Sequence, residues 1–248
     1  MADLHVFESG HGPDVVLLHG LPSPPHELEA VARELTGFRV LVPHLPGYGE
    51  SPAAPTRHSI RAVSEALRAA LRARGVQRPA LVGYSMGAYR AIELASALAA
   101  RSVLALAGFA SLSPEERAGM KGFADLLRAQ TDVKPLLPPR FLSDAGRNAD
   151  SARVVQAWAD AATTETLIEE LEDLAVAPSL LDTLAALRCP LTARTGELDV
   201  AVPPTHARAM AAAAPQGVVE IVPGAGHALF LEDRAGTLDA IRRVASAA

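Results

Sequence analysis

The feature that most constrains the fold of this chain is a serine between two glycines, at the junction of two expected elements. Residues 83–87 read Gly-Tyr-Ser-Met-Gly, with Ser85 at the centre. Residues 78–82 form a short apolar run typical of a buried parallel strand, and residues 86–100 carry apolar side chains at helical spacing. In a sharp strand-to-helix turn of this kind the serine is strained, and Cβ atoms at the glycine positions would collide with neighbouring backbone. This context favours a nucleophilic serine over the alternative, a glycine-rich turn with an incidental serine.

A nucleophilic serine needs a histidine base and an acid that orients the base, and the last third of the chain supplies both. Residues 190–195 read as a strand, and Asp199 follows it in a Gly-Glu-Leu-Asp turn. Residues 217–222 read as another strand, and His227 follows it after Pro-Gly-Ala-Gly. Open α/β sheets collect their reactive groups just past the carboxyl ends of strands. The sequence therefore predicts a triad of Ser85, His227 and Asp199.

Other carboxylates compete with Asp199 for the role of acid. Glu197 lies in the same turn, whereas Glu232 and Asp233 follow His227 closely and read as the start of the C-terminal helix. Asp199 is preferred because its turn can present a carboxylate toward the histidine loop. Taken singly, Asp199 could be a turn cap and His227 a surface imidazole. Three matches in the required order of serine, acid and histidine argue against coincidence.

Five motifs spread over nearly the whole chain carry a family resemblance. They are His-Gly-Leu-Pro at 19–22, Pro-Gly-Tyr-Gly-Glu-Ser at 46–51, the turn around Ser85, Gly-Glu-Leu-Asp-Val-Ala-Val-Pro at 196–203 and Gly-His at 226–227. The chain resembles the α/β-hydrolase superfamily, and most of all its small cap-bearing esterases and carbon–carbon bond hydrolases. The resemblance implies a mostly parallel central sheet flanked by helices, with a helical cap inserted after the strand that follows the helix of Ser85. Residues 1–109 and 187–248 would then form the core, and residues 110–186 the cap.

The order of apolar runs and helical stripes also predicts an α/β fold with a parallel sheet. Strands are expected at residues 4–7, 14–18, 39–42, 78–82, 103–106, 190–195 and 217–222. Core helices are expected from Ser23 as N-cap to residue 35, at 59–74 and at 86–100. Within 110–186 helices are expected at 113–129, opened by a capping box, and at 150–158, 164–174 and 178–187, with an irregular Pro-rich stretch at 131–139.

Acyl transfer also needs hydrogen-bond donors aimed at the developing oxyanion. The backbone N–H of Met86 is one candidate, because it follows the serine at the positive end of a helix. The second donor should come from the loop after the strand at residues 14–18. Pro22 has no N–H, so Leu21 is the best donor there, and the resemblance implies the same position.

Four other histidines are expected to have structural or surface positions. His19 directly ends a buried strand and is expected to brace loops rather than to act as a second base. His44 stands where relatives often carry Asp, two residues before the proline of the Pro-Gly-x-Gly loop. It is expected to be a half-exposed loop histidine that changes the hydrogen bonding of that loop, and its role stays open. His26 and His58 are expected on helical or loop surfaces.

Composition narrows the class of protein. A length of 248 residues suits one domain with an insertion, and 49% hydrophobic residues fit a globular enzyme. A net charge of −5 argues against nucleic acid as a partner. The lone Cys189 excludes an intramolecular disulfide and a cysteine-based metal site, and we expect its thiol to be buried. Neither a signal peptide nor an apolar run of the roughly 20 residues of a membrane helix is evident, so a cytoplasmic protein without a membrane partner is expected.

The expected cap at residues 110–186 should choose the substrate without performing the chemistry. Most of its large apolar residues should pack together and a minority should line the acyl pocket, namely some of Phe123, Leu126, Leu127, Phe141, Trp158 and Leu167. Its acidic residues are most simply a solvated helix face: Glu165, Glu169, Glu170, Glu172 and Asp173.

The preferred hypothesis is a serine hydrolase that cleaves a carboxylic ester or related small acyl compound through an acyl-enzyme, without cofactor or metal. Lactone opening, thioester cleavage and carbon–carbon bond cleavage beside a ketone stay open within that chemistry. Serine in place of aspartate at position 85 argues against hydrolysis of epoxides or haloalkanes through an aspartyl ester. A cofactor-free lyase or perhydrolase with the same triad is the alternative. A non-catalytic ligand receptor on this fold is the least favoured, and the oligomeric state is open.

Overall fold

The central feature of the fold is a mostly parallel β-sheet. The structure is a computed structural model that describes residues 4–54 and 59–247. Its strands are β1 (Val6–Gly10), β2 (Asp14–Leu18), β3 (Arg39–Pro43), β4 (Ala80–Tyr84), β5 (Ser102–Leu106), β6 (Leu191–Gly196) and β7 (Gly217–Val222). Across the described part of the sheet the order is β1-β3-β2-β4-β5-β6-β7, and only the pair β1 and β3 is antiparallel. The predicted fold class is therefore confirmed.

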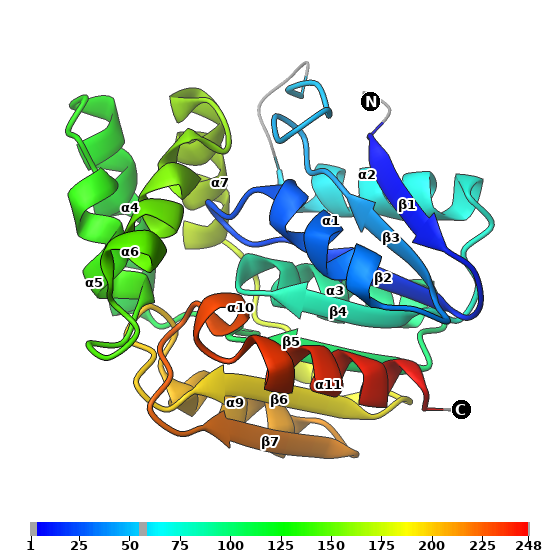
Figure 1. The fold of residues 1–248 in the computed structure, drawn as a ribbon. Helices are drawn as coiled ribbons and strands as arrows, with labels where there is room; N and C mark the ends of the chain where they lie inside the picture. Colours follow the sequence, from blue (N-terminus) through cyan, green and yellow to red (C-terminus); the bar gives the residue numbers. More distant parts are fainter. Residues whose placement is uncertain (1–3, 55–58, 248) are drawn as a thin grey trace.

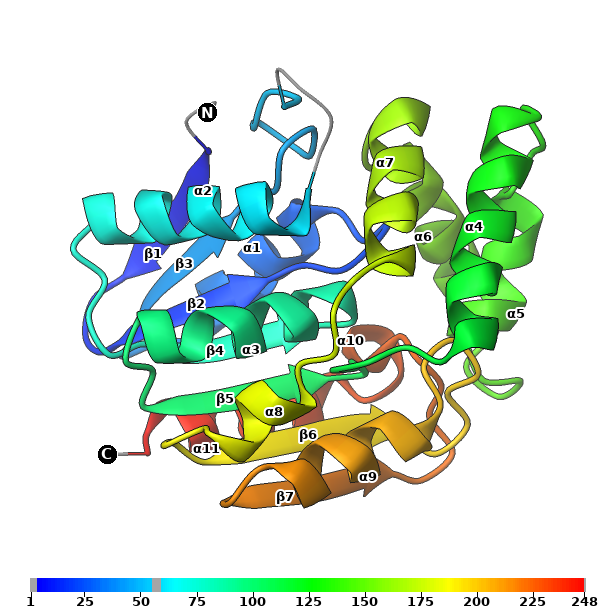
Figure 2. The same cartoon turned by 180° about the vertical axis from the view of Figure 1, so that it is seen from behind.

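Helices cover both faces of the sheet (Figures 1 and 2). One face carries α1 (Pro25–Glu34) and α11 (Arg234–Ala245), and the other carries α2 (Ile60–Ala73), α3 (Met86–Ala97), α8 (Leu181–Ala185) and α9 (Pro204–Ala213). Successive side chains of a strand point to opposite faces, so each buried strand contributes side chains to the core on both sides of the sheet. Val15 and Leu17 of β2 pack in the core of α1 and α11, whereas Val16 and Leu18 pack in the core of α2 and α3.

Helix starts follow local chemistry, with one correction. Helix α2 lies within the predicted range 59–74, and Ser59 is its N-cap, since its side chain accepts a hydrogen bond from the N–H of Ala62. Ser23 is not the N-cap of α1, because that helix begins at Pro25 and its N-cap is Pro24 without a side-chain cap bond. Pro24 itself precedes a proline, which disfavours the helical region for it, and its φ and ψ of −74° and 142° are extended.

A group of helices lies at the carboxyl ends of the parallel strands, between β5 and β6 in the chain (Figure 1). We call residues 114–175 the α4–α7 group; its helices are α4 (Pro114–Arg128), α5 (Leu137–Phe141), α6 (Ala149–Ala157) and α7 (Thr164–Ala175). The predicted capping box at Ser113 is present, with reciprocal bonds to Glu116. Helix α8, shorter than the predicted 178–187, packs beside α3 and α9 on the sheet. The wider interpretation of residues 110–186 as a cap stays a prediction.

The stretch at residues 131–139 is not irregular as predicted. Lys134–Leu136 form a 3₁₀ turn, η1, that leads directly into α5. Pro138 and Pro139 occupy the first turn of α5, where a missing N–H costs nothing because the first helical N–H groups have no partner within the helix. A second 3₁₀ turn, η2 (Trp158–Asp160), follows α6.

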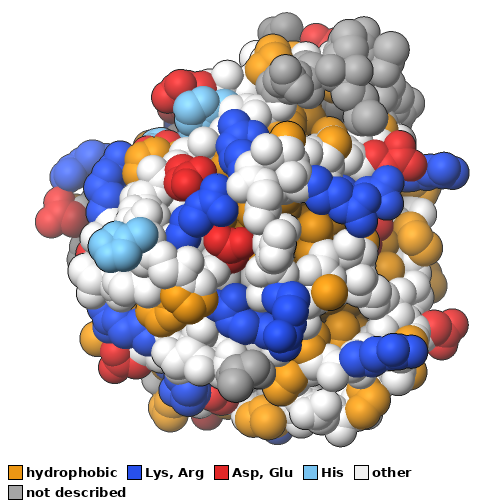
Figure 3. All heavy atoms as spheres, turned by 90° about the vertical axis from the view of Figure 1, so that its right-hand side faces the viewer, with side chains coloured by type: hydrophobic (Ala, Val, Ile, Leu, Met, Phe, Trp, Pro, Cys, Tyr) orange, Lys and Arg blue, Asp and Glu red, His pale blue; other side chains and the backbone are white. Residues whose placement is uncertain are grey.

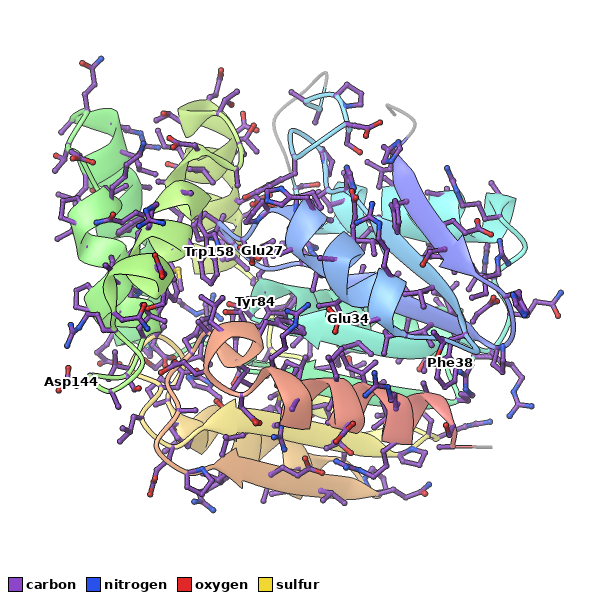
Figure 4. The ribbon with its side chains drawn as sticks, viewed as in Figure 1. Glu27, Glu34, Phe38, Tyr84, Asp144 and Trp158 are labelled. Carbon is purple, nitrogen blue, oxygen red and sulfur yellow. The ribbon has the colours of Figure 1, made fainter. Side chains whose placement is uncertain are left out.

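Two polar contacts, one buried and one part-buried, tie the α4–α7 side of the molecule to the sheet domain. The hydroxyl of Tyr48 donates to Oε2 of Glu170 on α7 at 2.6 Å. The indole N–H of Trp158 donates to Oε1 of Glu27 on α1 at 2.6 Å, and Figure 4 shows these two side chains together with Tyr84 nearby. Glu170 is only 2% exposed and Asp173 is buried too, so the expected solvated acidic face of α7 is wrong at these two positions.

The surface at the amino ends of the strands carries charges of both signs interspersed with hydrophobic side chains (Figure 3). Cys189 is buried just before β6, as expected. Within the described residues, every helix is too short or too polar to cross a membrane.

Glu170 should make the stability of the protein depend on pH. Burial raises its pKa from 4.5 to about 7, although the hydrogen bond from Tyr48 opposes the shift. The folded state therefore binds the proton more tightly than the unfolded chain does, and stability should fall as pH rises from about 5 to 8. The free energy of unfolding should therefore decrease between these pH values in the wild type. In Glu170→Gln this decrease should be smaller by on the order of 3 kcal/mol.

Urea unfolding at the two pH values measures this difference. Glu165→Gln, on an exposed position of the same helix, is the matched control and should follow the wild type. Parallel pH dependence of Glu170→Gln and the wild type would contradict the prediction.

Candidate active site

Ser85 lies on a sharp turn between β4 and α3, in a backbone conformation that residues with side chains rarely adopt. Its φ and ψ are 55° and −120°. A Cβ atom on Gly83 would lie 2.1 Å from the carbonyl oxygen of Gly87, and one on Gly87 would lie 2.1 Å from that of Leu18. Neither contact is tolerable, so both glycines are required by close backbone packing, as predicted.

Among residues 4–54 and 59–247, the Ser85 hydroxyl has no hydrogen-bond partner. The backbone N–H of Ser85 donates to the carbonyl oxygen of Leu106 on β5 at 2.8 Å, which anchors the turn to the sheet. Ser85 is the N-cap residue of α3, but its side chain makes no capping bond to that helix. It is 8% exposed and lines a pocket. The hydroxyl is therefore accessible to a small molecule in that pocket.

His227 and Asp199 form a buried pair at the carboxyl ends of β6 and β7. Nδ1 of His227 lies 2.8 Å from Oδ2 of Asp199, and neither side chain exposes more than 1% of its surface. Because a carboxylate only accepts hydrogen bonds, Nδ1 carries a proton, and in the neutral ring Nε2 is then the nitrogen with the lone pair. This is the tautomer that a general base requires.

Three further donors fix the Asp199 carboxylate. Its Oδ1 accepts the backbone N–H groups of Ala201 and Val202 at 2.9 and 2.8 Å. Its Oδ2 also accepts the hydroxyl of Thr195 at 3.3 Å. Thr195 was not recognised from the sequence, because nothing in its local sequence separates it from any other strand threonine.

The competing carboxylates have other partners. Glu197 is exposed, and its Oε2 accepts the N–H of Gly224. Glu232 accepts the N–H groups of Gly226 and Ser143, which ties the His227 loop to the segment after α5. Asp233 pairs with Arg194. Asp233 is the N-cap of α11 and so stands at the start of the C-terminal helix, as expected, whereas Glu232 ends the short helix α10 (Leu229–Glu232) instead.

Ser85 and His227 line the same pocket, although no hydrogen bond joins them among the described residues. Bonds between nucleophile and base are often long before substrate binds. Two aromatic rings hold the imidazole from the sides. The centroid of Phe141 lies 5.1 Å from that of His227, and the centroid of Tyr84 lies 5.3 Å from it.

Leu21 and Met86 both line the pocket next to Ser85. In the described part of the chain, the backbone N–H of neither residue has a hydrogen-bond acceptor. The loop of Leu21 passes close over the turn, since a Cβ on Gly20 would lie 2.8 Å from Cβ of Ser85. The peptide bond between Leu21 and Pro22 is cis. Two free donors thus border the space around the serine.

His19 braces this loop, as predicted. Its Nε2 accepts the backbone N–H of Leu45 at 3.1 Å, and its Nδ1 lies 3.0 Å from the carbonyl oxygen of Gly20 and donates to it. Burial lowers the pKa of His19 to about 4, so the ring is neutral at pH 7. A neutral ring with one donor and one acceptor satisfies both loops at once.

His44 is fully buried, not half-exposed as predicted. Its Nδ1 accepts the N–H of Glu50 at 3.0 Å, and its Nε2 lies 3.0 Å from Oε1 of Glu29. Burial lowers the pKa of His44. The residue orders the loop at 46–51 and does not line the pocket. His26 is exposed as predicted, and His58 lies outside the described residues.

The pocket beside Ser85 and His227 has an empty volume of about 640 Å³. The core contributes Leu21, Pro22, Ser85, Met86, Phe109, Ala201, Val202 and His227 to its wall. The α4–α7 group contributes Gly119, Met120, Phe123, Leu137, Arg140, Phe141, Leu171 and Leu174. Apart from Ser85, Arg140 and His227 the lining side chains are apolar, which suits a small, largely apolar molecule.

A minority of the apolar residues singled out in the sequence line this pocket. They are Phe123 and Phe141. Leu126 is exposed, whereas the others are buried away from the pocket: Leu127, Trp158 and Leu167. Arg140 was not recognised from the sequence, because a single arginine in a Pro-rich stretch carries no motif. Within residues 4–54 and 59–247, no three His, Cys, Asp or Glu side chains come together in a way that could hold a metal ion.

Comparison with known proteins adds a family match. A sequence model of the Alpha/beta hydrolase family matches residues 15–240. Among solved structures, a thermophilic esterase from Thermogutta terrifontis with malate bound is similar at a TM-score of 0.88 and 28% identity, over 98% of this chain and 94% of that one. The enol-lactonase from Burkholderia xenovorans LB400 has a TM-score of 0.85 at 20% identity, over 97% and 95% of the two chains, which shows a shared fold alone.

A shorter match comes from a curated relative. Epoxide hydrolase 3 from Siraitia grosvenorii is 37% identical over 91 residues, which is 34% of this chain and 28% of that protein.

Gly87→Ala should destabilise the protein by more than about 3 kcal/mol or prevent folding, because the new Cβ would lie 2.1 Å from the carbonyl oxygen of Leu18. The matched control is Gly122→Ala in α4, where a Cβ meets nothing within 4 Å. That control should be neutral or stabilising by up to about 1 kcal/mol. Equilibrium urea unfolding compares the two variants. A loss below about 1 kcal/mol at Gly87 would show that the turn can move.

Proposed function

The chain belongs to the alpha/beta hydrolase family, and from this premise we propose that it is a serine hydrolase of carboxylic esters or related small acyl compounds. The observation that carries the proposal is the juxtaposition in one pocket of the uncommitted Ser85 hydroxyl with the buried His227–Asp199 pair. Ser85, His227 and Asp199 are the proposed nucleophile, base and orienting acid. No other described residue of the pocket wall offers a nucleophile of this kind.

The first half of the proposed reaction forms an acyl-enzyme. Oγ of Ser85 attacks the carbonyl carbon while Nε2 of His227 takes the hydroxyl proton. The carbonyl oxygen becomes an oxyanion, and the free N–H groups of Leu21 and Met86 are the proposed donors to it. Collapse of the tetrahedral intermediate breaks the bond to the leaving alcohol, which receives the proton from His227.

The second half regenerates the enzyme. Water attacks the acyl-enzyme carbonyl while His227 accepts one of its protons, and the acid leaves as Ser85 recovers its hydrogen. The buried Asp199 carboxylate keeps Nδ1 protonated and stabilises the imidazolium form in both halves. No step of this scheme requires a group beyond the residues named.

The choice of an acyl substrate rests on the identity of the nucleophile. A serine attacks a carbonyl carbon, whereas opening an epoxide through an ester intermediate uses a carboxylate, and residue 85 is serine. Lactones and thioesters share the same reacting carbonyl and belong to the proposed class. Cleavage of a carbon–carbon bond beside a ketone, and lyase or perhydrolase chemistry on the same triad, are the alternatives for an activity screen.

We further propose that residues 110–186 act as a cap that selects the substrate. Half of the pocket wall comes from the α4–α7 group, and none of the proposed reacting groups does. The side chains of Phe123, Leu137 and Phe141 would contact the acyl chain. Substitutions there would then alter the preference among substrates while the chemistry stays with the core.

Ser85→Ala should lower kcat by about 10⁴-fold or more on any ester that the wild type hydrolyses. The fold should be retained, because the hydroxyl makes no structural bond among the described residues. A fluorophosphonate should label the wild type and not the variant, with circular dichroism as the check on folding. A folded Ser85→Ala protein that keeps more than about a tenth of wild-type kcat would remove Ser85 from the mechanism.

Asp199→Asn should cost far more activity than Glu197→Gln, although the two acids lie in the same turn. An amide at position 199 cannot hold His227 in the required tautomer, and a change of this kind costs about 10⁴-fold in kcat in a well-studied triad. Glu197 is exposed and bonds only to the N–H of Gly224, so its variant is the matched control. Steady-state kinetics on one ester measure both. An equal loss for the two variants would overturn the assignment of the acid.

A further inference from the structure

Arg140 is the single permanently charged residue in the described wall of the active-site pocket. The other fifteen lining residues are apolar, glycine, Ser85 or His227, and no carboxylate stands among them. A guanidinium at the edge of an otherwise apolar wall is the one group there that can attract an anion into the pocket.

The position of Arg140 is well determined by its neighbours. It lies in α5, next to Phe141, whose ring packs against His227 with 5.1 Å between centroids. The carbonyl oxygen of Phe141 accepts the N–H of Ala228 at 2.9 Å, which joins α5 to the histidine loop. The backbone of Arg140 is thus held beside the proposed reaction centre.

Arg140 differs in its contacts from other arginines of the α4–α7 group. Arg128, Arg147 and Arg153 each form an ion pair with a nearby carboxylate. Among the residues that the structure describes, the guanidinium of Arg140 forms neither a hydrogen bond nor an ion pair, and the charge that acts on it is that of Asp199. Its five N–H donors remain free for a ligand.

Arg140 stays a cation at neutral pH. Crowding by protein atoms lowers the pKa of its guanidinium, while the charge of Asp199 acts in the opposite direction. By surface area the residue is solvent-exposed, so water reaches it at the mouth of the pocket and the crowding is partial. A guanidinium in contact with water is not deprotonated under these conditions.

We propose that Arg140 binds a free carboxylate on the substrate, so that the substrate class is acidic: esters of small molecules that carry a second, unesterified carboxylate. The inference rests on the proposed function, because it assigns the reacting carbonyl to Ser85. A guanidinium matches a carboxylate with two parallel hydrogen bonds, which gives both attraction and orientation. The largely apolar lining of the pocket that holds both Ser85 and Arg140 suits the short hydrocarbon chain that would join the two groups.

A role through Asp199 is the competing explanation for the charge. If Arg140 only stabilised the Asp199 carboxylate, its loss would slow neutral and acidic esters by the same factor. If Arg140 binds the substrate, its loss changes the ratio between the two. The ratio of kcat/KM for a charged and an uncharged ester therefore separates the two roles.

The test compares monomethyl adipate with the matching methyl ester whose free carboxylate is replaced by a primary amide. A second pair carries the carboxylate or amide on the alcohol side of an acetate ester, which shows the side of the scissile bond that faces Arg140. In the wild type at least one acidic ester should be preferred over its amide, chiefly through KM. Arg140→Gln should lower that ratio about tenfold or more, the loss expected for a charge-assisted hydrogen bond.

Two variants accompany Arg140→Gln. Arg140→Lys retains the positive charge but not the planar guanidinium that makes two parallel hydrogen bonds. It should restore part of the ratio of kcat/KM between acid and amide. Arg153→Gln removes a charge from the same group of helices but lies outside the pocket wall, so its ratio should match the wild type. Added salt should reduce the wild-type preference, because solvent reaches Arg140. The inference would be overturned if the wild type gave the same kcat/KM for acid and amide in both pairs. It would also be overturned if the ratio of the two values were unchanged in Arg140→Gln.

Binding to an inactive protein separates this inference from the proposed function. The acidic esters are titrated into Ser85→Ala and into Ser85→Ala with Arg140→Gln, with the amides as controls. Binding of an acid that is tighter than that of its amide, and lost with Arg140, supports the carboxylate site even if the wild type cleaves no ester. If the wild type cleaves the neutral esters but Ser85→Ala binds acid and amide equally, the proposed function is retained and the carboxylate site is ruled out.

Discussion

The rest of the site depends on the contact between the backbone of α3 and the sheet beneath it. At Gly83 and Gly87 the two run so close that a Cβ would approach a carbonyl oxygen to 2.1 Å. This approach forces Ser85 into its positive φ and holds it above the edge of β4. The parallel order β4-β5-β6-β7 then brings the loops of Asp199 and His227 to the same edge.

The sequence could predict those parts whose signals are local. Two features can be recognised from neighbouring residues alone: the glycine pair around a serine, and the acid and histidine just past apolar runs. The structure accordingly brings Asp199 to His227, as the chain order led us to expect. Burial of Glu170 and His44 was missed, because each depends on partners far away in the chain. Helix α5 was missed for another reason. Prolines normally indicate the absence of a helix, and they are compatible with one only in its first turn, where those of α5 lie.

The α4–α7 side of the molecule is joined to the sheet domain through carboxyl groups that are poorly solvated. Glu170 accepts from Tyr48, and Glu27 accepts from Trp158. Burial raises the pKa of both carboxyl groups to about 7. A buried carboxyl in this range can shed its charge by taking up a proton, which avoids part of the cost of an isolated buried anion.

The distribution of tight and loose packing suggests which parts of the pocket can change. Around Ser85 every neighbouring backbone contact is close, so even an added methyl group at Gly83 or Gly87 has nowhere to go. In α4 the positions Gly119 and Gly122 have open space around them, and Gly119 borders the pocket. A side chain can therefore be added at Gly119 or Gly122 at little cost in stability, whereas none can be added at Gly83 or Gly87. A family with one chemistry and many substrates is the expected result of that division, and Arg140 lies on the side that is free to vary.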